Sequence, residues 1–302
     1  MNELLQKNNS LILSLHNNLE AITDMLSIGN CTIIDFKDVV QSTKNEVNNI
    51  AVHTVNTWQY GRSDAEKLAD TKIGKFAEDV VITILDKLNI DGYYSYDSFR
   101  TDNFKSHAPF DGILSKNLSQ QLVDLINDSV KNEGSRLSID TREAIRKSNA
   151  HTVEIKSTRL AVKYKARAGF TSYNDEKSIQ NLINHLMGLD FLNYPYYTRY
   201  GDMSYEKYCV FVEQRIKSGL GLDALKVKVR ELELLHSTDI FIRVFMDEDN
   251  QKAIVMGWID RNRFFTPPET HKLILPGKSE VPLYFVKALR FGYPLSKLKE
   301  LL

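Results

Sequence analysis

The sequence lacks the features that define several classes of protein. Only two cysteines, Cys31 and Cys209, occur in 302 residues. This scarcity excludes a disulfide-built scaffold and a cysteine-built zinc site, and it fits a reducing cytosol. No run approaches the roughly 18 apolar residues that a membrane span needs, and the first residues do not form a signal peptide. We therefore expect a cytoplasmic protein without a membrane partner.

An excess of charge of one sign is also missing. Lys and Arg number 39, and so do Asp and Glu, so the net charge is zero. This balance excludes a histone-like or polybasic protein, although it allows a local basic face. A hydrophobic content of 42% with 26% charged residues excludes wholesale disorder.

Three common catalytic signatures are absent from the sequence. None of the seven histidines has His-x-x-x-His or His-x-His spacing, which disfavours a histidine zinc site. There is no Gly-rich phosphate loop, whether GxxxxGK[ST] or GxGxxG, and no GxSxG elbow. A motor or nucleotide-binding role for this chain alone, and serine hydrolase chemistry, are therefore disfavoured.

Hydrophobic periodicity predicts an α/β (α+β) fold. Apolar stripes at helical spacing and alternating or β-branched runs follow one another along the chain. We expect helices at about 70–89, 117–149, 176–192 and 295–302, and strands at 93–99, 109–114, 152–158, 208–212, 227–229, 240–246 and 253–259. This order is typical of a mixed central sheet flanked by helices.

The first sixty residues are expected to form a helical accessory region. Apolar residues recur at three- and four-residue steps from Leu4 to Leu26, and Gly29-Asn30 is a suitable helix end. Residues 1–60 carry six acids and three bases. This region is either a dimerisation layer or a cover for the core, and 61–302 is the expected main domain.

One expected strand carries an unusual pair of charges. Side chains alternate across a strand, so Val153 and Ile155 face one side while Glu154 and Lys156 face the other. The apolar pair can pack on a core. Burying the charged pair without a purpose would be costly, and we therefore treat it as a candidate site.

The helix at 70–89 offers a further carboxylate. On a helical wheel, its apolar stripe is centred near Ile84, Glu78 lies at the margin of the stripe, and Asp79 lies on the solvent side. Only Glu78 is therefore expected to reach inward to a site at the edge of the sheet.

Together these groups suit a magnesium site. Mg²⁺ prefers a few carboxylate oxygens plus waters in near-octahedral geometry. Asp111 and Glu154 could supply the oxygens, the Ile155 carbonyl a neutral ligand, and Glu78 a direct or water-mediated contact. Lys156 could orient or help deprotonate an attacking water and offset phosphate charge. This is the set that metal-assisted phosphodiester hydrolysis requires.

The order of these residues resembles a known family. Glu78 on a helix, Pro109-Phe110-Asp111 and Glu154-Ile155-Lys156 are similar to the motif of the PD-(D/E)XK nuclease superfamily, which includes type II restriction endonucleases, repair nucleases and anti-phage effectors. The resemblance implies a restriction-endonuclease-like mixed sheet. It also implies metal binding by Asp111 and Glu154, catalytic assistance by Lys156, and a helix carboxylate at Glu78.

The resemblance covers about residues 70–195 and includes two departures. The family's Pro-Asp has one inserted residue here, Phe110. Asp111 and Glu154 are 43 positions apart (154 − 111), which is longer than usual. The polar stretch 117–149 is therefore expected to be a helical insertion between two neighbouring strands.

A basic segment leaves the candidate strand. Residues 156–167 contain no acid, and aromatic residues are interleaved with or follow the bases. The expected DNA-binding residues are Arg159, Lys163, Lys165 and Arg167. The segment either holds a nucleic-acid backbone or is a solvated loop.

Residues 261–302, with eight bases and three acids, are a second candidate contact region. Gln180 is either an auxiliary residue facing the site, as in some nuclease relatives, or a surface glutamine.

The sequence thus predicts a Mg²⁺-dependent DNA endonuclease of the restriction or anti-phage kind, with Mn²⁺ as a substitute ion. DNA is the expected partner. A homodimer, and a cognate methyltransferase or other defence-system partner, are implied by the resemblance alone. The alternatives are a non-catalytic DNA-binding or assembly subunit that keeps the nuclease fold, and a DNA repair exonuclease.

Overall fold

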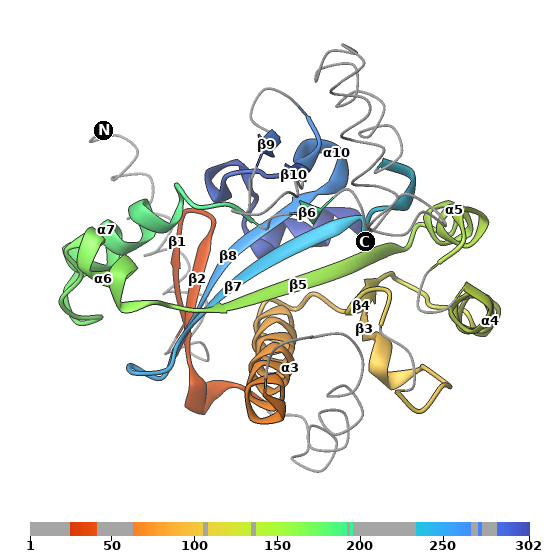
Figure 1. Cartoon of the computed structure of the whole chain (residues 1–302), viewed down its shortest axis with the longest axis horizontal. Helices are drawn as coiled ribbons and strands as arrows, with labels where there is room; N and C mark the ends of the chain where they lie inside the picture. The colour runs from red at the N-terminus through yellow and green to blue at the C-terminus, as the bar shows by residue number, and fades with distance from the viewer. Residues whose placement is uncertain are drawn as a thin grey trace.

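A seven-stranded mixed sheet forms the centre of the molecule (Figure 1). The computed structural model describes residues 25–40, 63–104, 108–133, 137–191, 194–195, 234–266, 271–273 and 283–302. The strands of the main sheet are β1 (Met25–Ile28), β2 (Cys31–Asp35), β3 (Tyr93–Ser95), β4 (Gly112–Leu114), β5 (His151–Arg159), β7 (Ile240–Asp247) and β8 (Lys252–Asp260). Their spatial order is β1-β2-β8-β7-β5-β4-β3. Only β5 and β7 are parallel neighbours in this sheet, and the other pairs are antiparallel.

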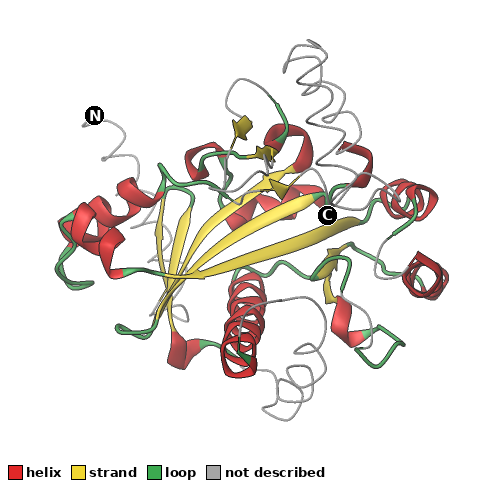
Figure 2. Cartoon of the chain, viewed as in Figure 1, coloured by secondary structure: helices red, strands yellow, loops and turns green. Residues whose placement is uncertain are grey.

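Helices flank this sheet, as the sequence predicts (Figure 2). The longest, α3 (Asp64–Lys87), packs on one face, where its Val80 and Ile84 join a core with Val153, Ile155 and other strand residues. The opposite face is covered by α6 (Val162–Ala168) and α7 (Glu176–Leu186), whose apolar side chains join a second core with β7 and β8. The mixed α/β sheet flanked by helices is therefore confirmed.

Shorter elements complete the described chain. They are η1 (Phe36–Asp38), η2 (Tyr96–Ser98), α4 (Gln120–Glu133), α5 (Ile139–Lys147), α10 (Arg261–Phe264), η4 (Leu289–Phe291), η5 (Leu295–Leu301) and a small sheet of β6 (Tyr194–Pro195), β10 (Leu283–Phe285) and β9 (His271–Leu273). The expected helical tail at 295–302 is thus a 3-10 helix. Among the described residues, no helix is both long and apolar enough to span a membrane.

The prediction that residues 1–60 are helical is wrong for residues 25–35, which the structure describes. Residues 25–35 form the antiparallel hairpin β1–β2, and Gly29 takes a left-handed φ of +60° in its turn. β2 pairs with β8, so the hairpin belongs to the main sheet and the expected boundary at residue 60 does not separate it from the core. The apolar runs in β1 and β2 are too short for periodicity to distinguish strand from helix. The remainder of 1–60, and the strand patterns at 208–212 and 227–229, lie outside the described residues.

The buried stripe of α3 follows the sequence pattern, with one difference. The helix begins with a capping box in which Ser63 and Glu66 satisfy each other's backbone N–H groups. Asp79, expected on the solvent side, is only 5% exposed. The helix wheel fails here because the segment after β2 covers this side of α3: the Phe36 ring packs on Phe76, and the Val40 N–H donates to the buried Thr83, one turn after Asp79.

The polar stretch 117–149 is a helical insertion, as expected. α4 and α5 lie between β4 and β5 in the chain, while the two strands are direct antiparallel neighbours, with Gly112 opposite Val153. Leu122, Ile126 and Ile145 pack with Phe110 in a third apolar cluster beside this end of the sheet (Figure 1). The long interval between Asp111 and Glu154 therefore does not separate their strands.

A buried polar network fixes the start of the parallel pair. The Asp239 carboxylate accepts hydrogen bonds from the backbone N–H and the hydroxyl of Thr152, at 3.0 and 2.8 Å. Arg146 of α5 donates to the other Asp239 oxygen at 2.8 Å. The network joins the insertion, β5 and the residue that precedes β7, so it sets the register of β5 on β7.

A bulge in β8 lies opposite Arg243. The register with β7 shifts by one residue between the pairs Ile242–Trp258 and Val244–Val255, and Gly257 takes a φ of +79° at this point. A Cβ atom at Gly257 would lie 2.2 Å from the Tyr293 carbonyl oxygen. The bulge therefore requires glycine for both its backbone conformation and its packing.

Gly257→Ala is expected to lower the free energy of unfolding by about 3 kcal/mol, because it combines left-handed backbone strain with a backbone clash. Gly74→Ala is the matched control, because a Cβ atom there meets no heavy atom within 4 Å. In the interior of α3 this control is expected to be neutral or to stabilise by up to ~1 kcal/mol. Urea unfolding of the two variants measures the difference, and equal stabilities would contradict the role of the bulge.

Candidate functional site

Asp111 lies beside the candidate strand although it is distant in sequence. It immediately precedes β4, and its backbone N–H donates to the Val153 carbonyl at 2.9 Å. Its carboxylate accepts a hydrogen bond of 2.5 Å from the backbone N–H of Ile155. The structure therefore brings Asp111 next to Glu154-Ile155-Lys156, as the sequence-based hypothesis requires.

The backbone N–H and C=O groups of Ile155 are directed toward the side of β5 on which Asp111 lies. In a strand, the N–H and C=O of one residue point to the same side. Because the Ile155 N–H is directed at the Asp111 carboxylate, the Ile155 carbonyl points toward the same edge. The strand β4 begins at Gly112, opposite Val153, so its pairing with β5 does not extend to Ile155. The Ile155 carbonyl, which is the predicted neutral ligand, therefore lies on the same side of β5 as Asp111.

The charged pair of β5 is arranged as alternation predicts. Val153 and Ile155 are buried against α3, and Glu154 and Lys156 lie on the other face. The Lys156 ammonium is 2.5 Å from a Glu154 carboxylate oxygen, and their side chains are 47% and 16% exposed. The Glu154 carboxylate is therefore mostly buried, while the Lys156 ammonium beside it is accessible to solvent.

Glu78 belongs to a group on the α3 side of Asp111. Its carboxylate receives two hydrogen bonds from the Lys75 ammonium, at 2.8 and 2.9 Å. Lys75 also forms an ion pair with Asp97 of η2. Sequence reasoning missed Lys75 and Asp97. The spacing of Lys75 three residues before Glu78 on a helix is a signal for the first contact, whereas only the fold brings Asp97 to it.

The carboxyl groups of the site hold their protons more tightly than usual. Burial raises the pKa of Glu78 to about 8, and nearby Asp111 and Asp97 add to the effect, while Lys75 opposes it. The pKa of Asp111 is likewise raised to about 7 by burial and by the charge of Glu154, against the opposing effects of Lys156, Lys75 and the Ile155 N–H. Asp111 is therefore coupled electrostatically to both the β5 pair and the α3 group.

Lys75 remains a cation in this setting. Burial lowers its pKa, but the charges of Glu78, Asp97 and Asp111 more than compensate and leave the pKa above its ordinary value. The ammonium therefore neutralises part of the negative charge that these three carboxyl groups would otherwise concentrate.

Tyr93 is a further group at this place that the sequence does not indicate. Its ring lies against Gly112, where an added Cβ atom would come within 2.4 Å of the hydroxyl oxygen. The hydroxyl is buried, and within the described residues it has no hydrogen-bond partner. Burial raises its pKa, and the charges of Glu78, Asp111, Asp97 and Glu154 raise it further. The neutral hydroxyl is thus an unused donor close to the carboxyl groups.

The site contains the type of ligand atom that a hard divalent cation prefers, namely carboxylate and carbonyl oxygen. Among the described residues, no three His, Cys, Asp or Glu side chains form a ready group of metal ligands. Mg²⁺ needs fewer, because it usually keeps several waters and binds through one or two carboxylates plus substrate phosphate. Asp111 and Glu154, with the Ile155 carbonyl, meet that lower requirement in donor chemistry.

The expected DNA-binding bases are not equally available. Arg159 contacts Asp70 and Glu248 at 2.9 Å each, and Lys165 contacts Asp247 and Asp249. These acids come from distant segments, so the sequence run did not reveal them. Lys163 and Arg167 of α6 are exposed, and the Lys163 ammonium lies 5.3 Å from the centre of the Tyr164 ring.

The other predicted contacts have internal partners. Gln180 of α7 donates to Asn184 at 2.9 Å, and no contact within the described residues joins it to Glu154 or Lys156. In the basic C-terminal region, the buried Lys287 donates to the Thr266 carbonyl at 2.8 Å, and Arg261 lies 3.4 Å from Asp239. These interactions favour a structural role for Lys287 and Arg261.

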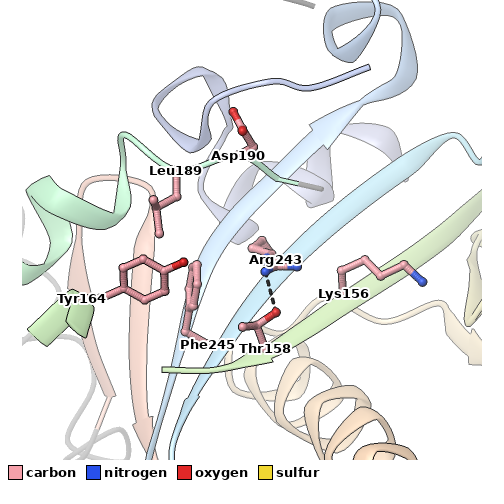
Figure 3. A pocket seen from close by; sticks show the side chains of 7 residues that line it. All are labelled: Lys156, Thr158, Tyr164, Leu189, Asp190, Arg243 and Phe245. Carbon is pink, nitrogen blue, oxygen red and sulfur yellow. Dashed lines mark hydrogen bonds between the residues drawn. The ribbon is translucent and has the colours of Figure 1, made fainter. Parts of the chain in front are cut away.

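A pocket of about 380 Å³ adjoins the charged pair of β5 (Figure 3). Its lining residues come from β5 (Lys156 and Thr158), β7 (Arg243 and Phe245), α6 (Tyr164) and the segment after α7 (Leu189 and Asp190). Because β5 and β7 are parallel, Lys156 is opposite Arg243 and Thr158 opposite Phe245. The pocket therefore combines cations and aromatic rings on the face that presents Glu154.

Comparison of this chain with protein-family models, with curated proteins and with solved structures finds no match.

Proposed function

We propose that this chain is a Mg²⁺-dependent DNA endonuclease with a restriction-endonuclease-like fold of the PD-(D/E)XK kind, acting in restriction or anti-phage defence. The observation that carries the proposal is the hydrogen bond from the Ile155 N–H to the Asp111 carboxylate. It holds the two halves of the motif together across an insertion of two helices. A chance resemblance would not require these segments to be neighbours.

The electrostatics of the site support the same function. The charge of Glu154 raises the pKa of Asp111, so the two carboxyl groups are held closer together than their charges favour. A divalent cation relieves this repulsion and lowers the pKa of the carboxyl groups that bind it. Asp111, Glu154 and the Ile155 carbonyl would hold Mg²⁺, with Mn²⁺ as a substitute, and Glu78 would act directly or through water.

The chain's own groups have separate roles in this proposal. The bound ion would supply Lewis-acid polarisation of the phosphate and a lower pKa of water. Lys156, the accessible ammonium beside Glu154, orients the attacking water and offsets the charge of the phosphate. The Ile155 N–H fixes the Asp111 carboxylate, and Lys75 holds the Glu78 carboxylate on α3.

Closed-circular plasmid tests the function directly. The purified chain is expected to nick or linearise it in the presence of Mg²⁺ or Mn²⁺ and to leave it intact in EDTA, as followed on an agarose gel. Degradation of linear DNA with no effect on the closed circle would indicate an exonuclease instead. Binding of DNA without any cleavage, with or without the ion, would contradict hydrolysis and favour a non-catalytic subunit.

A further inference from the structure

The pocket beside Lys156 contains a guanidinium whose charge is not matched by a contacting carboxylate. Arg243 donates to the Thr158 hydroxyl at 2.6 Å, and its guanidinium carbon is 5.1 Å from the centre of the Phe245 ring. Its Nε–H is buried and has no acceptor within the described residues. No described carboxylate forms an ion pair with it. The side chain thus presents a positive charge and an unused donor.

Arg243 stays protonated despite this burial. Burial lowers its pKa to about 10, and the charges of Tyr164 and Asp190 oppose the shift. At neutral pH the guanidinium is therefore a cation with much of its hydration removed. A partly desolvated guanidinium binds an anionic oxygen more strongly than an exposed one does.

The rest of the pocket fits a flat ring rather than a bare anion. In Figure 3, Tyr164 and Arg243 lie on either side of Phe245, and Asp190 lies above them. Aromatic faces stack on nucleobases of any sequence, and a carboxylate accepts hydrogen bonds from the N–H groups of a base. The volume of about 380 Å³ is within the range of sites for small organic ligands.

We propose that this pocket holds one unpaired nucleotide of the nucleic acid, with its phosphate between Lys156 and Arg243 and its base against the partly exposed ring of Tyr164, above the buried Phe245. The proposal rests on the proposed nuclease function, because Lys156 belongs both to the pocket and to the site of hydrolysis. It adds that the protein engages a base removed from the double helix, so single-stranded or locally opened DNA is the form it binds in the pocket.

The test uses a fluorescently labelled single-stranded oligonucleotide and the full chain in EDTA, where hydrolysis does not interfere. Fluorescence anisotropy gives the affinity. Arg243→Met and Tyr164→Leu are each expected to weaken binding about tenfold, because one removes the phosphate partner and the other a stacking face. Tyr164→Phe keeps the ring and is expected to bind like the wild type. Lys147→Met, which removes an exposed charge on α5, is the matched control for Arg243→Met.

A strand of abasic residues separates base binding from phosphate binding. It is expected to bind the wild type about tenfold more weakly than the normal strand and to be insensitive to Tyr164→Leu. A mononucleotide 5′-phosphate is expected to compete only at much higher concentration than the oligonucleotide. Equal binding of the abasic strand, equal competition by the mononucleotide, or unchanged affinity of both pocket variants would each overturn the proposal. If Arg243→Met does not fold, as judged by circular dichroism, Arg243→Lys and Tyr164→Leu carry the test.

Plasmid cleavage in Mg²⁺, measured alongside, distinguishes the two proposals. A wild type that binds the oligonucleotide with this residue dependence but cleaves no DNA retains the pocket assignment and loses the nuclease function. If the wild type cleaves plasmid but the pocket variants bind the oligonucleotide normally, the nuclease function is retained and the pocket assignment is lost.

Discussion

Glu154→Gln is expected to reduce plasmid cleavage in Mg²⁺ at least about 100-fold. The glutamine keeps the size of the side chain and removes its negative charge, which the proposed cation site and the Lys156 ammonium both use. Loss of a group that acts on the reacting atoms typically costs a factor of about 10²–10⁴ in rate. Initial rates of loss of the supercoiled form, at saturating enzyme, give the comparison.

The control for this substitution is Glu143→Gln. Glu143 also pairs with a lysine, Lys147, but the pair is exposed on α5. The Glu143→Gln variant is expected to cleave plasmid at the wild-type rate. Lys156→Met should resemble Glu154→Gln in rate, and both variants should keep the wild-type circular dichroism. Full cleavage by both Glu154→Gln and Lys156→Met would exclude this site as the catalytic centre.

Asp111→Asn is expected to stabilise the metal-free protein at pH 8. The asparagine can still accept the hydrogen bond from the Ile155 N–H, while the charge that Glu154 repels is gone. A shift from the ordinary value of 3.8 to about 7 corresponds to about 4 kcal/mol at alkaline pH. Because the accessible surface of Asp111 shows that water reaches part of this side chain, we expect roughly half of that, ~2 kcal/mol.

The same shifts give the wild type a characteristic pH dependence. The pKa of Asp111 rises from 3.8 to about 7, and that of Glu78 from 4.5 to about 8. For both groups the folded-state pKa lies above the unfolded one, so the folded protein binds more protons than the unfolded chain between these values. The stability they contribute is fully present below about pH 4 and is lost as the pH rises toward about 8.

Thermal unfolding in EDTA between pH 5 and pH 9 measures this dependence. The decline of the wild-type midpoint toward alkaline pH should be shallower in Asp111→Asn, and Mg²⁺ should raise the midpoint of the wild type more than that of the variant. Asp128→Asn, at an exposed position on α4, is the control and should follow the wild type. A wild-type midpoint that rises with pH from 5 to 8 in parallel with that of Asp111→Asn would contradict the crowding of these carboxyl groups.

Local sequence patterns determined the elements that carry the candidate site. The two-residue alternation of Val153, Glu154, Ile155 and Lys156 correctly separates a core face from a charged face, because successive side chains in any strand point to opposite sides. The stripe of α3 and the helical nature of 117–149 follow from the 3.6-residue period in the same way. These features depend on backbone geometry within one element, so they can be predicted before any contact is known.

The tertiary structure alone decided which elements became neighbours. The contact between Asp111 and Ile155 spans 44 positions, and the acids that pair with Arg159 and Lys165 come from other segments. Likewise, residues 25–35 became a hairpin of the main sheet because β2 pairs with β8, a strand more than 200 residues away. Strand pairing and the ion pairs that accompany it are set by packing across the whole sheet, and no local period encodes them. The sequence therefore determined the chemistry available to this protein, whereas the fold decided that Asp111 meets Glu154-Ile155-Lys156 and that Arg243 lies beside Lys156.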